Sequence, residues 1–409
     1  KLGGNLPTSP NQADTEKELA ETKSIVNQIG IEKLIDLPRM KDPNSLAALE
    51  IMKVIIPPTG MINPLLCMLM TTSATKLSIN HGNSAISPYI YSCQSLFLAT
   101  TDLKACCQFS ELALELLKQF DDKEADVKTL ITVGAFVHHW KYHLKDCIPF
   151  VRSAYLIGLE IGELDGVAWG IFHENHFRYF IGENLAELEE RLTRGSQILQ
   201  QVKQNLLLNH NQRVRQIVLN LIGQNSQATE ICGEVYNEIQ ALETYQVAQD
   251  RASMCNLYTH KTILFYLFGN YQQAVESARL AASLIDSIFS RYIGVPVYFY
   301  QSLAELSVYL SQPKNEQELI SKKVQSNQEK MLNWANNAPM NFQHKYDLVE
   351  AEKCRVLGHK LEAIELYDKA IAGAKKNEYL HEVALANELT AKFYLDWNKE
   401  KVAATYMQE

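Results

Sequence analysis

The chain has 409 residues, of which 46% are apolar, and a formal net charge of −8 at pH 7. This apolar fraction excludes global disorder, and the acidic balance argues against a nucleic-acid-binding protein, which needs a basic surface. The 18 glycines and 12 prolines fall below the usual ~7% and ~5%, which favours helices over a turn-rich all-β fold. No apolar run reaches the ~18 residues that a membrane-spanning helix requires, so we expect no membrane insertion.

The eight cysteines are scattered through apolar helical pattern and form no CxxC pair. Disulfide frameworks belong to short, cysteine-dense secreted domains, which this chain does not resemble. We therefore expect free thiols that pack as small core residues in a reducing, cytoplasmic compartment.

Residues 1–15 are rich in Gly, Pro, Asn and Ser, which predicts a linker or disordered tail. From residue 16 to 409 the helical period dominates. Residues 184–204 and 360–376 show it best, because their apolar side chains fall on one helix face and their charged side chains on the other. We expect about nineteen helices of roughly 12 to 20 residues and no strand, since the most β-like stretch, 295–300, contains a proline and continues into helical pattern.

Short polar segments, or segments that carry Gly or Pro, separate these helical patterns and predict inter-helix breaks. They are Pro57-Pro58, His81-Gly82-Asn83, Asp121-Asp122, Gly182-Glu183, Gly269-Asn270, Pro313-Lys314-Asn315 and Gly358-His359.

Two of these breaks open a tetratricopeptide-like pattern. A glycine occupies the turn, an aromatic residue lies in the second helix, and small residues let that helix pack closely against the first. The signature residues are Gly269, Tyr271, Ala274 and Ala281 in one copy, and Gly358, Ala363, Tyr367 and Ala370 in the other. Weaker copies place Cys106, Cys147 and Ala403 at the equivalent small position.

The spacing of these small residues predicts the repeat length. Cys106 and Cys147 are 41 residues apart, and Ala363 and Ala403 are 40 apart. This pitch near 40 residues exceeds the ~34 of a standard tetratricopeptide repeat. Because one helix pair cannot bury its apolar face alone, we predict an all-α fold, a right-handed α-solenoid of tetratricopeptide-like helix pairs over residues 16–409. The last repeat is expected to be truncated at the C-terminus.

The motifs of the common phosphoryl-transfer enzymes and zinc proteases are missing from the sequence. It contains no GxxxxGK[ST], no GxGxxG, no HRD and DFG pair, and no HExxH. We therefore expect no enzymatic activity in this chain, no cofactor and no metal.

Imidazoles and aromatic rings gather in two segments about one helix pair apart. His139 and Trp140 lie in the first, which we expect on one helix together with His143, and His173, His176 and Tyr179 lie in the second. Imidazoles on adjacent helices could hold a metal, but no carboxylate is suitably placed among them. The plainer interpretation is that these residues pack between helix pairs or line an inner groove. They are the candidate groove or ligand-binding residues.

The chain resembles the helical repeat region of very large cyanobacterial signalling kinases. In that family a Ser/Thr kinase domain, an AAA-like NTPase, a tetratricopeptide-like region, a GAF sensor and a histidine kinase follow one another. The resemblance covers residues 17 to 409. The matching stretches are LIDLPRM at 34–40, GNS at 82–84, HW at 139–140, NWA at 333–335, APMNF at 338–342, ALANEL at 384–389 and KFY at 392–394.

The resemblance implies a fragment of a multi-domain sensor kinase whose catalytic residues lie in flanking domains. Two functions remain open. The first is a non-catalytic interaction and signal-relay module that binds a protein partner, or an adjacent domain of the same polypeptide, in its concave groove. The second is a sensor of a small molecule or peptide that regulates an adjacent NTPase or kinase.

Overall fold

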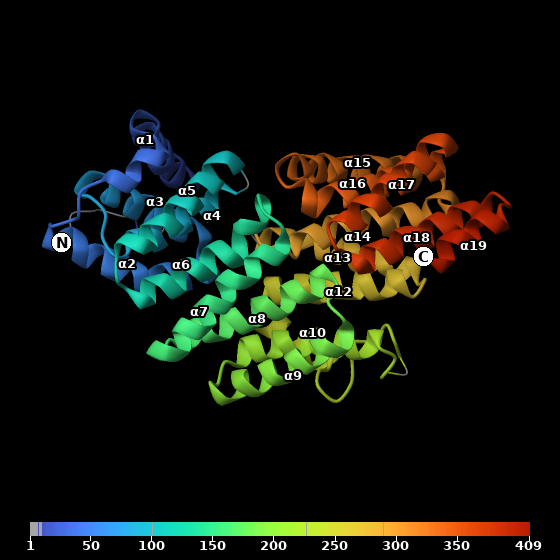
Figure 1. Cartoon of the computed structure of the whole chain (residues 1–409), viewed down its shortest axis with the longest axis horizontal. Coiled ribbons are helices and arrows are strands. Elements are labelled where there is room, and N and C mark those ends of the chain that lie inside the picture. The colour runs from blue at the N-terminus through green and yellow to red at the C-terminus, as the bar shows by residue number, and fades with distance from the viewer. Residues whose placement is uncertain (1–6, 8–9, 100, 226, 289) are drawn as a thin grey trace. The chain divides into compact units, whose positions relative to one another are not determined.

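The computed structural model describes residues 7, 10–99, 101–225, 227–288 and 290–409. Over these residues the chain forms nineteen α-helices, α1 to α19, joined by turns and short 3-10 helices (Figure 1). They contain no β-strand, only isolated bridges between Arg39 and Asn83 and between Cys232 and Asn237. The β-like stretch 295–300 lies inside α14 (Gly294–Val308). Pro296 fits there because the N–H groups of the first helical turn have no partner within the helix.

The described residues group into two compact units. Unit 1 comprises Lys1–Lys141 and Pro149–Gly170, and unit 2 comprises Tyr142–Ile148 and Ile171–Glu409. The helices that supply unit 1 are α1 (Gln12–Ile29), α2 (Pro43–Ile62), α3 (Pro64–His81), α4 (Ser87–Leu98), α5 (Leu103–Leu116), α6 (Lys123–Phe136), α7 (Ile148–Ile161) and the start of α8 (Leu164–Ile181). None of the described helices has the length and apolar content to cross a bilayer. All eight cysteines are free thiols.

Helix α1 begins within the segment that the sequence assigns to the tail. Asn11 caps it: its side chain accepts a hydrogen bond from the Asp14 amide (3.0 Å), and the Asp14 carboxylate accepts one from the Asn11 amide (2.9 Å). This reciprocal capping box satisfies N–H groups at the helix start and extends α1 back to Gln12. Residues 1–6, 8 and 9 of the predicted tail lie outside the described residues.

The break predicted at Pro57-Pro58 is wrong, because α2 continues through both prolines to Ile62. Neighbouring side chains support the helix there, since the Thr59 hydroxyl (2.8 Å) and the Cys67 thiol (3.5 Å) donate to the Ile56 carbonyl. The chain breaks instead at Asn63, whose side chain accepts from the Leu66 amide and caps α3. The other six predicted breaks coincide with helix ends in the structure.

Unit 2 is built from successive helix pairs. Its remaining helices are α9 (Leu185–Gln201), α10 (Asn205–Leu221), α11 (Glu238–Val247), α12 (Arg251–Leu267), α13 (Tyr271–Ser283), α14, α15 (Lys314–Asn337), α16 (Pro339–Leu357), α17 (Lys360–Lys376), α18 (Leu380–Asp396) and α19 (Glu400–Gln408). From α8 onward, the first helices of the pairs are α8, α10, α12, α14, α16 and α18, and they begin 41 to 46 residues apart. This spacing is close to the predicted pitch.

The signature residues occupy the turns and helix contacts of two of these pairs. Gly269 and Gly358 have φ of 77° and 81°, a left-handed conformation that ends α12 and α16. Ala274 and Ala363 have no exposed surface, Ala281 and Ala370 are 1% exposed, and Tyr367 is fully buried. Tyr271 contacts the Tyr266 ring on α12, with 5.5 Å between ring centroids. A small side chain at the alanine positions lets two helix axes approach to about 8 Å.

We predict that Ala274→Leu or Ala363→Leu lowers the free energy of unfolding by roughly 1–3 kcal/mol, because the larger side chain must push two packed helices apart. Denaturant unfolding measures this loss. Hydrogen exchange should locate the damage of Ala363→Leu in the C-terminal helix pairs, from about Asn341 onward, because a repeat is coupled mainly to its neighbours. Loss of protection spread evenly over the whole chain would contradict this expectation.

Candidate functional site

The first group of predicted site residues does not lie on a helix. Helix α6 ends at Phe136, and Val137 leaves the helical conformation with φ of −124°, so His139 and Trp140 lie in a short 3-10 turn, His138–Trp140. The two side chains are buried, and their ring centroids are 4.4 Å apart. His143 has extended backbone and belongs to unit 2. The expectation of one helix for all these residues is therefore wrong.

The second group lies on α8, within unit 2, as the sequence predicts. His173 and His176 are buried, whereas Tyr179 retains partial exposure. The His176 ring packs between Phe172 and Phe180, at centroid distances of 5.1 and 4.8 Å. Contact between these residues and a ligand remains a prediction.

The first helices α10 and α12 add basic residues that the sequence analysis did not single out. His260 on α12 lies 5.8 Å from both His176 and Tyr179, measured between ring centroids. His210 and Arg213 on α10 complete the group, and Phe172 contacts the His210 ring at 5.5 Å. We call His176, His210, Arg213 and His260 the basic cluster. Single buried histidines and arginines on different helices carry no sequence signal of their proximity.

The imidazoles of the basic cluster are held in the neutral form. Burial lowers the pKa of His260 to about 3 and lowers the pKa values of His176 and His210 well below the usual range. The nearby Arg213 charge lowers all three further, because two positive charges repel. At neutral pH the positive charge of the cluster therefore lies on Arg213.

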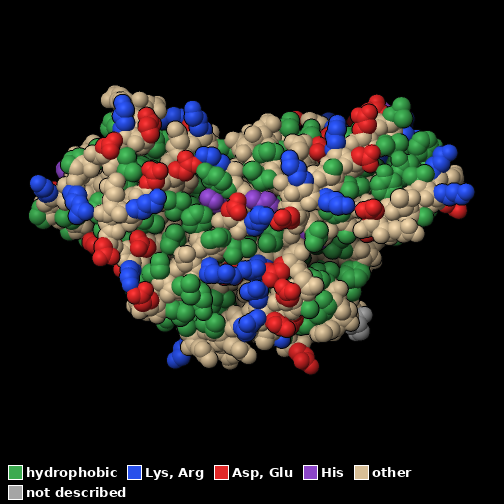
Figure 2. Space-filling view, viewed as in Figure 1, with side chains coloured by type: hydrophobic (Ala, Val, Ile, Leu, Met, Phe, Trp, Pro, Cys, Tyr) green, Lys and Arg blue, Asp and Glu red, His purple; other side chains and the backbone are tan. Residues whose placement is uncertain are grey.

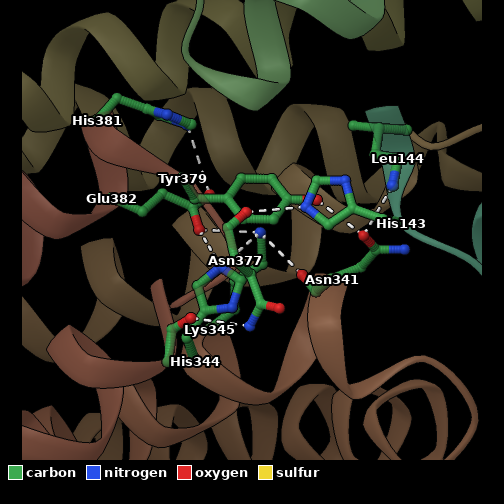
Figure 3. Close-up of polar contacts among 10 residues, drawn as sticks. His143, Leu144, Asn341, His344, Lys345, Asn377, Tyr379, His381 and Glu382 are labelled. Carbon is green, nitrogen blue, oxygen red and sulfur yellow. Dashed lines mark hydrogen bonds and ion pairs between the residues drawn. The ribbon is translucent and has the colours of Figure 1, made fainter. Parts of the chain in front are cut away.

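A second buried polar group joins α16 to α18 (Figure 3). Lys345 is 2% exposed, and its ammonium donates to the Glu382 carboxylate (2.9 Å) and to the Asn341 carbonyl (2.9 Å). His344 Nε2 donates to the same Glu382 oxygen (2.5 Å). The Lys345 ammonium also lies 4.3 Å from the centre of the Tyr379 ring. We call His344, Lys345, Tyr379 and Glu382 the charged cluster.

Electrostatics determine the protonation states in the charged cluster. Burial opposes the charge on Glu382, but Lys345 and His344 outweigh it and hold the pKa of Glu382 well below its usual range. Burial also lowers the pKa of His344 to about 4, so this imidazole is neutral at pH 7. A carboxylate that is paired in this way is a poor general base, because its proton affinity is low. The arrangement is suited to joining helices rather than to catalysis.

The charged cluster extends to the segment Tyr142–Ile148 through Asn341. The Asn341 side-chain oxygen accepts from the Leu144 amide (2.9 Å) and from the Tyr379 hydroxyl (2.8 Å), and its nitrogen donates to the Tyr142 carbonyl (2.7 Å). Asn341 lies in the APMNF stretch on which the family resemblance rests.

His143 adds a further contact from the same segment. Its Nδ1 accepts from the Lys145 amide (3.0 Å), so the proton lies on Nε2, which donates to the Asn377 carbonyl (2.8 Å). About two hundred residues of chain separate this segment from α16 and α18, so no local sequence pattern could predict the contact.

The described residues contain no group of three or more His, Cys, Asp or Glu side chains that could hold a metal ion. The two clusters also differ in how their charges are balanced. In the charged cluster Lys345 and Glu382 compensate each other, whereas in the basic cluster the Arg213 guanidinium forms no ion pair and no hydrogen bond of normal geometry among the described residues. Arg213 is therefore a buried charge in unit 2 that no described carboxylate compensates.

Comparisons with known proteins identify the fold. No protein-family model matches the chain, and no curated protein matches its sequence. The structure is similar to that of a Rap protein complexed with Competence and Sporulation Factor, with a TM-score of 0.59 and 12% sequence identity. The match covers 89% of this chain and 95% of the Rap chain. At this identity the likeness shows the fold alone, an all-α helical repeat of tetratricopeptide-like pairs, which confirms the predicted fold class.

We predict that Glu382→Gln or Lys345→Met lowers the free energy of unfolding by about 3–5 kcal/mol, because either change leaves an uncompensated charge or donor in the core. The matched control is Glu388→Gln on the same helix, which breaks the exposed pair with Lys392 and should cost less than about 1 kcal/mol. Urea unfolding compares the three variants. Similar losses for the control and the buried variants would refute the assignment.

We also predict that stability decreases as the pH falls from 6.5 towards 4. His139, His260 and His344 have pKa values of about 3, 3 and 4 in the folded chain, against 6.5 when exposed. Below 6.5 the unfolded chain takes up protons that the folded chain excludes, so each such histidine removes about 2 kcal/mol at pH 5. Urea unfolding at a series of pH values measures this slope. His260→Phe should make it shallower, and a flat profile would contradict the prediction.

Proposed function

We propose that the chain is a non-catalytic interaction and signal-relay module. It binds a protein partner or an adjacent domain in the groove lined by the first helices of its pairs. The observation that carries this proposal is the helical repeat fold, shared with a Rap protein over 89% of the chain. Stacked helix pairs offer an extended surface for recognition, and small changes between pairs add up along the array.

The Rap structure was determined as a complex with Competence and Sporulation Factor, so at least one protein of this fold binds a separate regulatory factor. Transfer of this property to the present chain is part of the proposal. The candidate contact residues remain His139, Trp140, His173, His176 and Tyr179. Four of them are buried, so a partner reaches them only through a local rearrangement, whereas Tyr179 is partly exposed.

The charge distribution supports a protein partner rather than nucleic acid. Figure 2 shows Lys and Arg side chains interspersed with Asp and Glu side chains over the visible face. Ion pairs such as Arg215 with Glu189 (2.8 Å) and Lys261 with Glu238 (2.6 Å) neutralise many of these charges locally. Together with the net charge of −8, this mixture of charges on the visible face favours a protein partner over a phosphate backbone. A cytoplasmic location is part of the same proposal.

The kinase context is a separate part of the proposal. From the family resemblance we propose that this chain lies between an NTPase or kinase half and a GAF and histidine-kinase half of one polypeptide, where it would relay binding events to the catalytic domains. The open reading frame around this sequence tests that context directly. A frame without such domains would remove the kinase context and leave the interaction module intact.

A second candidate function is sensing of a small ligand. The specific observation in its favour is the basic cluster, in which a buried guanidinium forms no ion pair and no hydrogen bond of normal geometry among the described residues. A buried unpaired charge lowers the stability of the folded chain. A position that keeps such a charge despite this loss is a candidate for ligand recognition.

We predict that a partner or ligand identified by native mass spectrometry of the purified chain binds Tyr179→Ala at least tenfold more weakly than wild type, because Tyr179 is the one member of the candidate group that is partly exposed. Titration calorimetry measures the affinity. The control is Tyr406→Ala, which alters an aromatic residue on α19 that is paired with Asp368.

The same preparation should show neither ATP hydrolysis nor autophosphorylation, because the sequence has no phosphate-binding loop. ATP turnover that survives a change of purification route would refute the non-catalytic assignment.

For the binding prediction, equal affinities of wild type and Tyr179→Ala for the partner or ligand would remove Tyr179 from the contact surface.

A further inference from the structure

Arg213 is the exception among the arginines of unit 2. Arg178 pairs with Glu174 and Glu183, Arg215 with Glu189, and Arg355 with Glu352. Arg213 is 0% exposed, yet none of its three guanidinium nitrogens makes a hydrogen bond of normal geometry to a described residue. The neutral phenol of Tyr236 lies close enough for the Arg213 charge to lower its pKa, but it supplies no counter-charge. No ion pair joins it to a described carboxylate. A buried ion without a counter-charge costs several kcal/mol.

Other unpaired polar atoms share this part of the structure. Nε2 of His176, Nε2 of His260 and Oε1 of Gln216 are buried and have no hydrogen-bond partner among the described residues. Buried polar atoms are usually paired, so two unpaired imidazole nitrogens on which the Arg213 charge acts call for a physical reason. His176 and His260 lie on the helices that flank α10 along the series of first helices, and their rings are 5.8 Å apart.

The groups that act on this position are mainly basic. The titratable groups that act on His176 are His260, His173, Arg213 and His210, and Arg213 also acts on the neutral phenol of Tyr236. Asp250 is linked to the cluster only at a distance: the Ser253 hydroxyl donates to Asp250 (2.5 Å) and accepts from His210 Nε2 (2.9 Å). A cationic ligand would be repelled here, and an apolar ligand would leave the guanidinium unpaired. An anionic group would complete the site.

We propose that Arg213, with His176 and His260, binds the carboxylate or phosphate group of a small ligand. The inference deepens the ligand-sensing candidate above and rests on it. The planar guanidinium presents parallel N–H donors that match two oxygens of either group. His260 Nδ1 donates to the Asn256 carbonyl (2.7 Å), which leaves Nε2 free of a proton. Protonation of Nε2 beside a bound anion would add a second charged donor.

The burial of Arg213 also determines how the site can be tested. Because the guanidinium is not exposed, an anion enters only when the surrounding helices open locally. Equilibrium stabilisation is therefore a better measure than fast titration. A ligand that binds the folded chain alone raises the unfolding temperature, by roughly 2 °C for a tenfold excess over its dissociation constant.

The experiment is thermal unfolding of the full chain in inorganic phosphate, in acetate and in chloride at matched ionic strength. Phosphate, acetate or both should raise the unfolding temperature of wild type relative to chloride, and the larger shift identifies the preferred group. Arg213→Met, which keeps the volume but removes the charge, should lose this response. In chloride it should unfold at the same temperature as wild type or higher, because it removes an unpaired buried charge. The matched control Arg215→Met, also on α10, should keep the anion response.

Two results would overturn the inference. One is an anion response that is equal in wild type and Arg213→Met. The other is a strong loss of stability of Arg213→Met in chloride, which would mean that Arg213 is already compensated. If a ligand found by native mass spectrometry binds both forms equally, ligand sensing stands and the anion site fails. If no ligand and no anion binds wild type, both fail.

Discussion

Every helix pair of this protein depends on its neighbours to bury its apolar face, and that constraint determines most of the architecture. A pair of helices of this length leaves one apolar side open, so the pairs must stack. Stacking at short distance requires small residues where two helices cross, and Ala274 and Ala363 provide them. Cys106 on α5 and Cys147 in the 3-10 helix Leu144–Cys147, which the sequence assigns to weaker copies of the pattern, are also fully buried.

Close stacking also buries polar side chains in the core. In unit 2 some of these buried charges are compensated by a partner and one is not. Around Lys345 and Glu382 each charge has a partner, and the hydrogen bonds extend through Asn341 to the segment Tyr142–Ile148. This arrangement joins parts of the chain that are far apart in sequence, and removing one member leaves another uncompensated. Around Arg213 no described residue supplies a counter-charge. A fold that needed only stability would place an apolar side chain there, which is why this position suggests a binding role.

The buried histidines of unit 2 make the stability of the folded chain depend on pH. Neutral imidazoles pack well against aromatic rings, as His176 does between Phe172 and Phe180. Their charged forms do not, because a buried imidazolium loses its hydration. The interior of unit 2 therefore combines good packing at neutral pH with sensitivity to acid.

The sequence by itself determined the features that depend on local periodicity and on residue size. It predicted an all-α repeat with a pitch near 40, the glycine turns at Gly269 and Gly358, and six of the seven helix breaks, because these follow from backbone preferences and from side chains a few residues apart. The tertiary structure decided the rest. Contacts with Thr59 and Cys67 carry α2 past two prolines, which no local rule anticipates.

The candidate site shows the same division. The sequence identified His173 and His176 as candidates in one segment, and their spacing of three residues puts them on the same face of α8. It could not place Arg213 and His260 beside them, or Glu382 beside Lys345, because those distances depend on how whole helices pack. Which buried charge finds a partner and which does not is likewise a property of the packed helices, because burial and counter-charges come from residues distant in the chain.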